Sequence, residues 1–120
     1  MRIDPATVPL VPEPANDLQL RTLITAAQTG SDISVTWVQL DGRHRRLRTH
    51  RSTRVYAVLD GRIDLQLADD RPLSLTAGQL GVVPRGMPYE LAGTGIYLVI
   101  NAPAFVPGDD EYDQPVAGQL

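Results

Sequence analysis

The chain has 120 residues, enough for one domain with a hydrophobic core but not for two. Apolar residues make up 42% of it, a normal share for a globular protein, and no apolar run is long enough to cross a membrane. The absence of cysteine excludes disulfides, a thiol nucleophile and cysteine-ligated metals. No basic region followed by a long apolar stretch opens the chain, so we expect a cytoplasmic location and no membrane partner.

The charge is unevenly distributed along the chain. The net charge of -3 argues against a nucleic-acid partner, yet all 11 basic side chains are arginines. A cluster of them lies in the middle of the chain, at Arg43, Arg45, Arg46, Arg48, Arg51 and Arg54. Two interpretations are open: a site for a specific anionic partner, or an ordinary solvated face with surface ion pairs.

The element pattern is that of an all-β domain. Residues 1–16 contain four prolines, which disfavour a helix and predict an extended arm. From residue 17 to 105, alternating apolar residues predict short strands, and Asp41-Gly42 and Asp60-Gly61 are typical of hairpin turns. Residues 106–120, with Pro107, Gly108 and several acids, predict a surface tail. Short strands separated by turns indicate a β-sandwich or barrel.

Two motifs carry a further signal. The first has five, one, three and six residues between its members Gly42, Arg48, His50, Arg54 and Gly61. The second has five, one and two residues between Gly78, Pro84, Gly86 and Tyr89. This spacing resembles the two motifs of the cupin family, with sixteen residues between them. The resemblance covers about residues 17–105 and implies a double-stranded β-helix, or jelly-roll barrel, often found as a homodimer.

The same resemblance implies that the usual metal site of the family is altered. The family usually has histidine, histidine, glutamate and histidine at positions 48, 50, 54 and 89, and only His50 is retained here. Arginine stays protonated and offers no lone pair. We therefore expect no metal and no other cofactor. His44 lies about 20 Å along an extended strand from His50 and is interpreted as a surface histidine.

The replacement residues suggest a different use of the pocket. Residues two apart on a strand share a face, so Arg48 and His50 are expected to point the same way, with Arg54 and Tyr89 approaching the same interior. Two arginines suit a carboxylate, phosphate or enolate, unless they turn outward and pair with acids. Arg48 and Arg54 are thus the candidate anion clamp.

Four further assignments complete the hypothesis. His50 is the candidate acid or base and Tyr89 the candidate proton donor, although either can equally be structural. Tyr56 and Trp37 are candidate walls of a ligand cavity, or ordinary core.

The function indicated is a metal-independent cupin that binds a small anionic or carbonyl-containing molecule and catalyses isomerisation, epimerisation or cyclisation. A non-catalytic binding or sensor barrel, and a metal-dependent oxygenase with atypical ligands, remain open.

Overall fold

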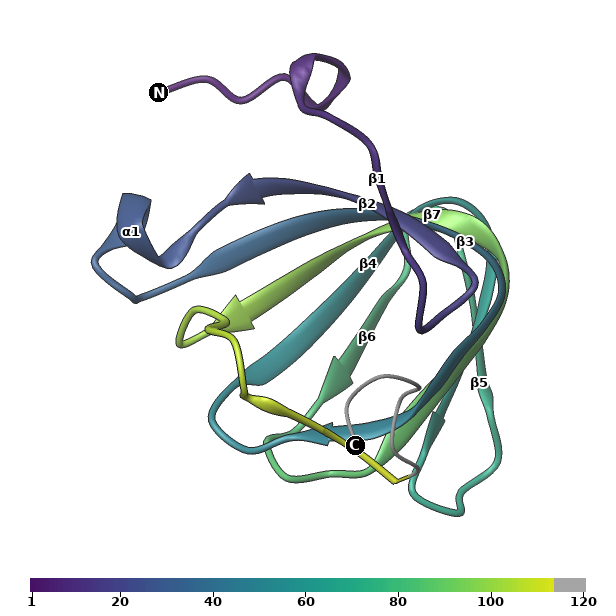
Figure 1. Cartoon of the computed structure of the whole chain (residues 1–120). Helices are drawn as coiled ribbons and strands as arrows, with labels where there is room; N and C mark the ends of the chain where they lie inside the picture. Colours follow the sequence, from purple (N-terminus) through teal and green to yellow (C-terminus); the bar gives the residue numbers. More distant parts are fainter. Residues whose placement is uncertain (114–120) are drawn as a thin grey trace.

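The structure, a computed structural model, describes residues 1–113. Antiparallel strands dominate it, and Figure 1 shows them curling around a common interior. The helical segments are the 3₁₀ helix Pro5–Thr7 and α1 (Ala26–Thr29). The strands are β1 (Val11–Glu13), β2 (Leu18–Ile24), β3 (Ser34–Thr49), β4 (Thr53–Leu67), β5 (Leu73–Thr76), β6 (Leu80–Val83), β7 (Tyr89–Ala102) and β8 (Asp110–Tyr112).

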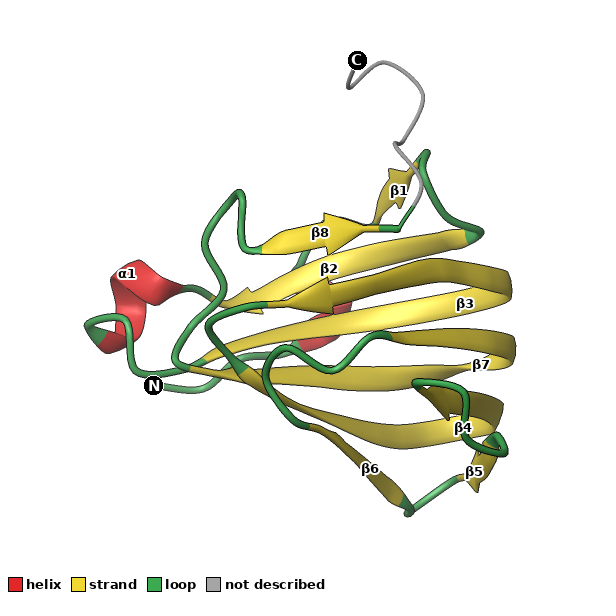
Figure 2. Cartoon of the chain, turned by 90° about the horizontal axis from the view of Figure 1, so that it is seen from below, coloured by secondary structure: helices red, strands yellow, loops and turns green. Residues whose placement is uncertain are grey.

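The strands form one curled sheet in the order β1-β2-β3-β7-β4-β5, with β6 paired to β4 and β8 paired to β3. Every pairing is antiparallel. Figure 2 shows β3, β7 and β4 side by side as long, bent ribbons. The expected all-β jelly-roll fold is confirmed. Among the described residues, no helix is long and apolar enough to span a membrane.

The predicted hairpin turns at Asp41-Gly42 and Asp60-Gly61 are wrong, because β3 and β4 run straight through them. Gly42 pairs with Gly93 of β7, and Gly61 pairs with Gly95. Gly61 has a φ of 76°, and a Cβ there would overlap the Thr94 carbonyl oxygen. The glycines mark places where long strands bend and cross closely, which only a residue without a side chain permits.

A one-residue bulge in β3 decides which side chains enter the barrel. The pairing of β3 with β7 shifts by one residue between His44 and Leu47. Before the shift, Leu40 and His44 face the interior, and after it Leu47 and Thr49 are the buried residues. Because side chains alternate along a strand, one extra residue exchanges the two faces.

The chain ends also differ from expectation. The N-terminal arm is extended in part, since β1 pairs with the edge of β2, but Pro5–Thr7 form a 3₁₀ turn. The expected surface tail is wrong for residues 106–113, because Asp109 is buried and β8 pairs with β3. The rest of that tail, residues 114–120, lies outside the described residues.

We predict that Gly61→Ala destabilises the fold by about 2–3 kcal/mol, because the new methyl group overlaps backbone that cannot move easily. Gly86→Ala is the matched control: its φ is 77°, but nothing lies within 4 Å of the added methyl. Urea denaturation gives the free energy of unfolding of both variants. The extra loss in Gly61→Ala measures the steric overlap, because both residues have a similar positive φ. Equal losses of stability would contradict this role for Gly61.

Candidate functional site

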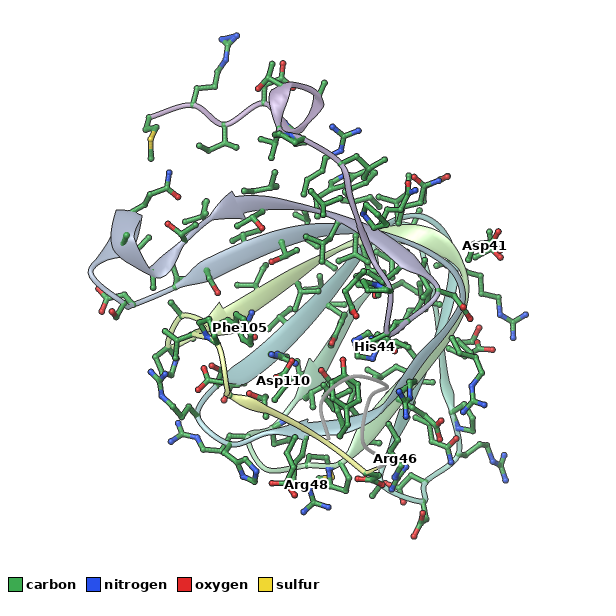
Figure 3. All side chains as sticks on the ribbon, viewed as in Figure 1. Asp41, His44, Arg46, Arg48, Phe105 and Asp110 are labelled. Atoms are coloured by element: carbon green, nitrogen blue, oxygen red, sulfur yellow. The ribbon has the colours of Figure 1, made fainter. Side chains whose placement is uncertain are left out.

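A cavity of about 470 Å³ opens into the barrel. Its walls come from β2, β3, β4 and β7, and the segment 105–112 forms one side of it. Figure 3 shows His44 and Asp110 within the curl of the sheet, and Arg48 at its periphery. Apolar side chains and tyrosine rings make up most of the lining, with a few polar groups among them. This size and composition are typical of small-molecule sites.

Arg54 is the central polar residue of the site. Its guanidinium is almost completely buried and donates hydrogen bonds to Asn101 Oδ1 at 2.5 Å, to the Tyr89 hydroxyl at 2.7 Å and to Asp110 Oδ1 at 2.6 Å. Burial opposes the charge, but Tyr89, Tyr56 and Asp110 outweigh burial and raise the pKa of the guanidinium above its ordinary value. The buried cation is therefore permanent and is neutralised by one carboxylate.

Tyr89 and Tyr56 continue this network toward the cavity. Their hydroxyl oxygens are 2.6 Å apart, and both side chains are buried. Burial raises the pKa of Tyr89, against the lowering effect of Arg54, and burial raises the pKa of Tyr56 further. Both phenols therefore remain protonated donors. When Tyr89 accepts from Arg54 and donates to Tyr56, the Tyr56 proton is free to point at a ligand.

His44 lines the same cavity from β3. Its Nδ1 is 3.0 Å from the carbonyl oxygen of Arg45, which can only accept, so Nδ1 carries the proton. Burial lowers the pKa of His44 below its ordinary value of 6.5, so the ring is neutral at neutral pH. Nε2 then has a free lone pair, the requirement for a general base. Tyr112 stacks on the ring, with 6.0 Å between centroids.

The segment around β8 is tied down along its length. Asp109 accepts from Arg51 at 3.2 Å, Asp110 accepts from Arg54, and Glu111 lies 2.7 Å from His50. Since Asp110 and Tyr112 both line the cavity, these contacts complete one of its walls. The acidic run that looked like a tail thus supplies the counter-ion of the buried arginine.

The structure brings together some of the predicted site residues. Arg54 and Tyr56 share the inner face of β4, and the Tyr89 hydroxyl reaches both, although Tyr89 lies behind the cavity wall.

The other three candidates lie elsewhere. His50 is exposed and pairs with Glu111. Arg48 is outside the cavity lining, as is Trp37, which lies beneath Arg21 at 4.8 Å. The expectation that Arg48 and His50 share the interior with Arg54 is wrong, because the bulge turns both outward. Trp37 alternates with Thr36 and Val38, which are the residues that line the cavity.

Sequence reasoning missed several residues of this site, among them His44, Asp110 and Asn101. His44 was assigned to the surface, but it faces the cavity because it precedes the bulge. The signal that could have found His44 was Leu40, an apolar residue expected to face the core. Residues four apart on a regular strand share a face, so His44 should point the same way as Leu40. Asp110 and Asn101 had no comparable signal, since their roles follow from contacts 56 and 47 residues away along the chain.

The residues present do not fit the metal site of the family resemblance. Of the four motif positions, His50 and Arg48 lie outside the cavity, and Arg54 fills the interior with a cation that cannot bind a metal. Across residues 1–113, no group of three or more histidine, cysteine, aspartate or glutamate side chains is arranged to hold a metal ion.

Neither a family model nor a curated protein matches the sequence. The fold is similar to that of Pac13, described as a unique nucleoside dehydratase, with a TM-score of 0.81, 18% identity, and coverage of 98% of this chain and 93% of Pac13. Streptomyces Pac13 with a histidine-to-glutamine substitution has been solved with uridine and covers 97% and 92%, with a TM-score of 0.80 and 17% identity.

A second similar structure is KdgF from Halomonas sp., with a TM-score of 0.75, 14% identity, and coverage of 88% of this chain and 96% of KdgF. Oxalate decarboxylase from Bacillus subtilis gives a TM-score of 0.76 at 14% identity, covering 91% of this chain and 31% of the enzyme. The chain therefore has a small cupin-type β-barrel fold.

We predict that Asp110→Ala destabilises the protein by about 2–4 kcal/mol, because it leaves the Arg54 charge buried without a counter-ion. Glu111→Ala, one residue away on the same strand, removes only an exposed pair and should cost less than about 1 kcal/mol. Chemical denaturation at pH 7 measures both. Similar values for the two variants would contradict a central role for the Arg54–Asp110 pair.

Proposed function

We propose that the cavity is the active site of a metal-independent enzyme that abstracts a proton beside a carbonyl group of a small substrate. The observation that carries this proposal is the pairing of a base and an acid across one cavity. His44 offers an unprotonated nitrogen, and Tyr56 offers a phenol proton supported by Tyr89 and Arg54. Proton transfer between such groups typically accelerates a reaction by about 10²–10⁴-fold.

The favoured reaction is the elimination of water from a β-hydroxycarbonyl compound. His44 Nε2 takes the proton from the carbon beside the carbonyl, and the electron pair of that C–H bond forms an enolate. Tyr56 donates a hydrogen bond to the developing oxyanion, with Arg54 behind Tyr89 favouring the added negative charge. The enolate then collapses, the β carbon–oxygen bond breaks, and the departing hydroxide takes the proton from His44 to leave as water.

One comparison favours elimination over the isomerisation, epimerisation or cyclisation expected from the sequence. The similar Pac13 is a nucleoside dehydratase, and its variants solved with uridine replace a histidine or a tyrosine, the residue types that meet in this cavity. All these reactions begin with the same proton abstraction, so they differ only in how the enolate is resolved. A non-catalytic binding barrel would use the same cavity without this step.

The first test compares the two histidines. We predict that His44→Gln lowers kcat on a β-hydroxycarbonyl substrate, sought among nucleosides and sugars oxidised to a carbonyl, by at least about 10²-fold, while substrate still binds. His50→Gln is the matched control and should retain nearly wild-type turnover, because His50 is exposed and outside the cavity. Steady-state kinetics measures kcat of both variants, and calorimetry measures their affinity for the substrate. Loss of activity in His50→Gln alone would contradict the proposal.

The pH dependence gives a second readout of the same proposal. A general base must be neutral to act, and burial lowers the pKa of His44 below 6.5. The rate kcat/KM should therefore be constant near pH 7 and fall only as the pH drops through this lowered pKa. In the His44→Gln variant, the pH profile of the residual kcat/KM should no longer show this decrease at acidic pH. Dialysis against a chelator should leave turnover unchanged, whereas restoration by iron, manganese or nickel would favour the oxygenase alternative.

We also propose that the protein is a homodimer joined through an outer apolar face. Two cross-strand rows run over β3, β7, β4 and β6 on the outside of the barrel, and they consist of Trp37, Leu98, Ala57 and Leu80, and of Val35, Ile100, Val55 and Val82. Leu80 is 63% exposed and Val82 is 54% exposed. The two rows contain no charged residue, although the guanidinium of Arg21 covers Trp37 at their β3 end. The rest of this apolar face suits a second copy of itself across a twofold axis.

We predict that Leu80→Asp shifts the protein to monomers, because it places a charge at the most exposed position of this face, on β6. Leu73→Asp is the control, since Leu73 is 48% exposed on β5 but lies outside the two rows. Light scattering after gel filtration gives the mass of each variant. A wild-type protein that is monomeric at high micromolar concentration would contradict the dimer.

A further inference from the structure

The charges around the cavity do not sum to a site for an anion. Apart from tyrosines, its ionisable lining residues are Glu13, His44, Arg54 and Asp110. Arg54 is matched by Asp110 at 2.6 Å, and His44 is neutral because burial lowers its pKa. Glu13 therefore leaves the lining with one negative charge in excess. The lining therefore offers a phosphate or carboxylate the repulsion of Glu13, while its one arginine is already paired with Asp110.

Glu13 is held in this position by its own neighbours. Its two carboxylate oxygens accept hydrogen bonds from the Ala15 amide at 3.1 Å and from Asn16 Nδ2 at 2.9 Å. Asn16 Nδ2 also donates to the Tyr112 hydroxyl at 3.0 Å, and Tyr112 stacks on His44. The carboxylate is thus fixed on the β1 side of the cavity, within electrostatic reach of His44 and Tyr97.

The polar groups left free for a ligand are neutral. The Tyr97 side chain is 99% buried and lines the cavity, yet its hydroxyl has no hydrogen-bond partner anywhere in residues 1–113. Burial raises the pKa of Tyr97, so this hydroxyl stays a donor. Thr36 also lines the cavity and is diagonal to Tyr97 across the β3–β7 pairing, where its hydroxyl likewise lacks a partner in the described part of the chain. Both hydroxyls are therefore available to hydrogen-bond a ligand in the cavity.

We propose that the substrate is an uncharged, hydroxylated molecule with a flat ring, in other words an unphosphorylated nucleoside or a molecule of that shape and polarity. Tyr97 and Thr36 hydrogen-bond its polar groups, and the apolar walls from Leu18 and Val38 pack on its ring. Glu13 rejects the phosphorylated or carboxylated relatives. This inference rests on the proposed function for the location of the substrate, but it concerns charge selection, which binding alone reveals.

The role of Glu13 reverses the expectation drawn from the sequence. Two arginines were expected to clamp an anion, but Arg48 lies outside the cavity lining and Arg54 is occupied by Asp110 and two neutral partners. The one arginine that remains inside serves the tyrosine pair and is not free to receive a ligand's charge. The arginine cluster is therefore not evidence for an anionic substrate.

The test is a binding comparison of matched pairs that differ only in charge: uridine with uridine 5′-monophosphate, and ribose with ribose 5-phosphate. Calorimetry or ligand-observed NMR on the wild-type protein measures the dissociation constant of each compound. In any pair for which binding is detected, the neutral member should bind at least about tenfold more tightly than its phosphorylated partner. Tighter binding of the phosphorylated members would overturn the proposal, and so would failure of every neutral member to bind. Binding of uridine without any turnover of oxidised substrates would instead count against the proposed function alone.

Two variants locate the selection. Glu13→Gln removes one charge and should narrow the difference between uridine and its monophosphate several-fold, whereas Glu111→Gln, an equally conservative change at an exposed site, should not. Tyr97→Phe should weaken uridine several-fold without changing the ratio within a pair, because it removes a neutral donor. A ratio that is the same in the wild type, Glu13→Gln and Glu111→Gln would contradict the role of Glu13.

Discussion

The buried guanidinium of Arg54 is the interaction on which the site depends. A charge inside a barrel is tolerated only when its donors are satisfied and its charge is compensated. Arg54 on β4 meets these conditions by binding Asn101 and Tyr89 on β7 and Asp110 on β8. One side chain thus links three strands, orders the two tyrosines and fixes the segment that closes the cavity. Its position is the one at which the resemblance to the cupin motifs implies a metal ligand, and a buried cation lies there instead.

The β3 bulge is the second constraint, because it decides which side chains of the arginine-rich segment face the cavity and which face outward. Before the shift, His44 faces the cavity, and after it Leu47 and Thr49 fill the interior while Arg48 and His50 face outward. Without the extra residue, the side chains of one end of β3 would exchange faces with their neighbours. The bulge also explains why a histidine at the expected motif position is exposed, and why a histidine six residues earlier is the one beside the tyrosines.

Together these constraints bring a histidine and one of a pair of hydrogen-bonded tyrosines to the lining of one cavity. A neutral histidine and a phenol supported by a cation can supply the base and the acid that proton transfer at carbon needs. Because Arg54 is paired with Asp110 inside the protein, its charge is not available to a ligand. The groups left to contact a ligand are neutral hydroxyls and the Glu13 carboxylate. The proposed chemistry and the proposed preference for an uncharged ligand therefore rest on the same ion pair.

The sequence determined the fold because its evidence is local and periodic. The alternating strands predicted a β-sandwich or barrel, and the resemblance of the spaced glycines and Pro84 to the cupin motifs implied a jelly roll. The two-residue period placed Tyr56 beside Arg54 on one face. The same glycines misled about turns, since a glycine that bends a strand has the same sequence signal as one in a hairpin. Only the tertiary structure decided which basic residues enter the cavity. A single-residue bulge leaves no composition signal, and the pairing of Arg54 with Asp110 joins residues 56 apart in the chain.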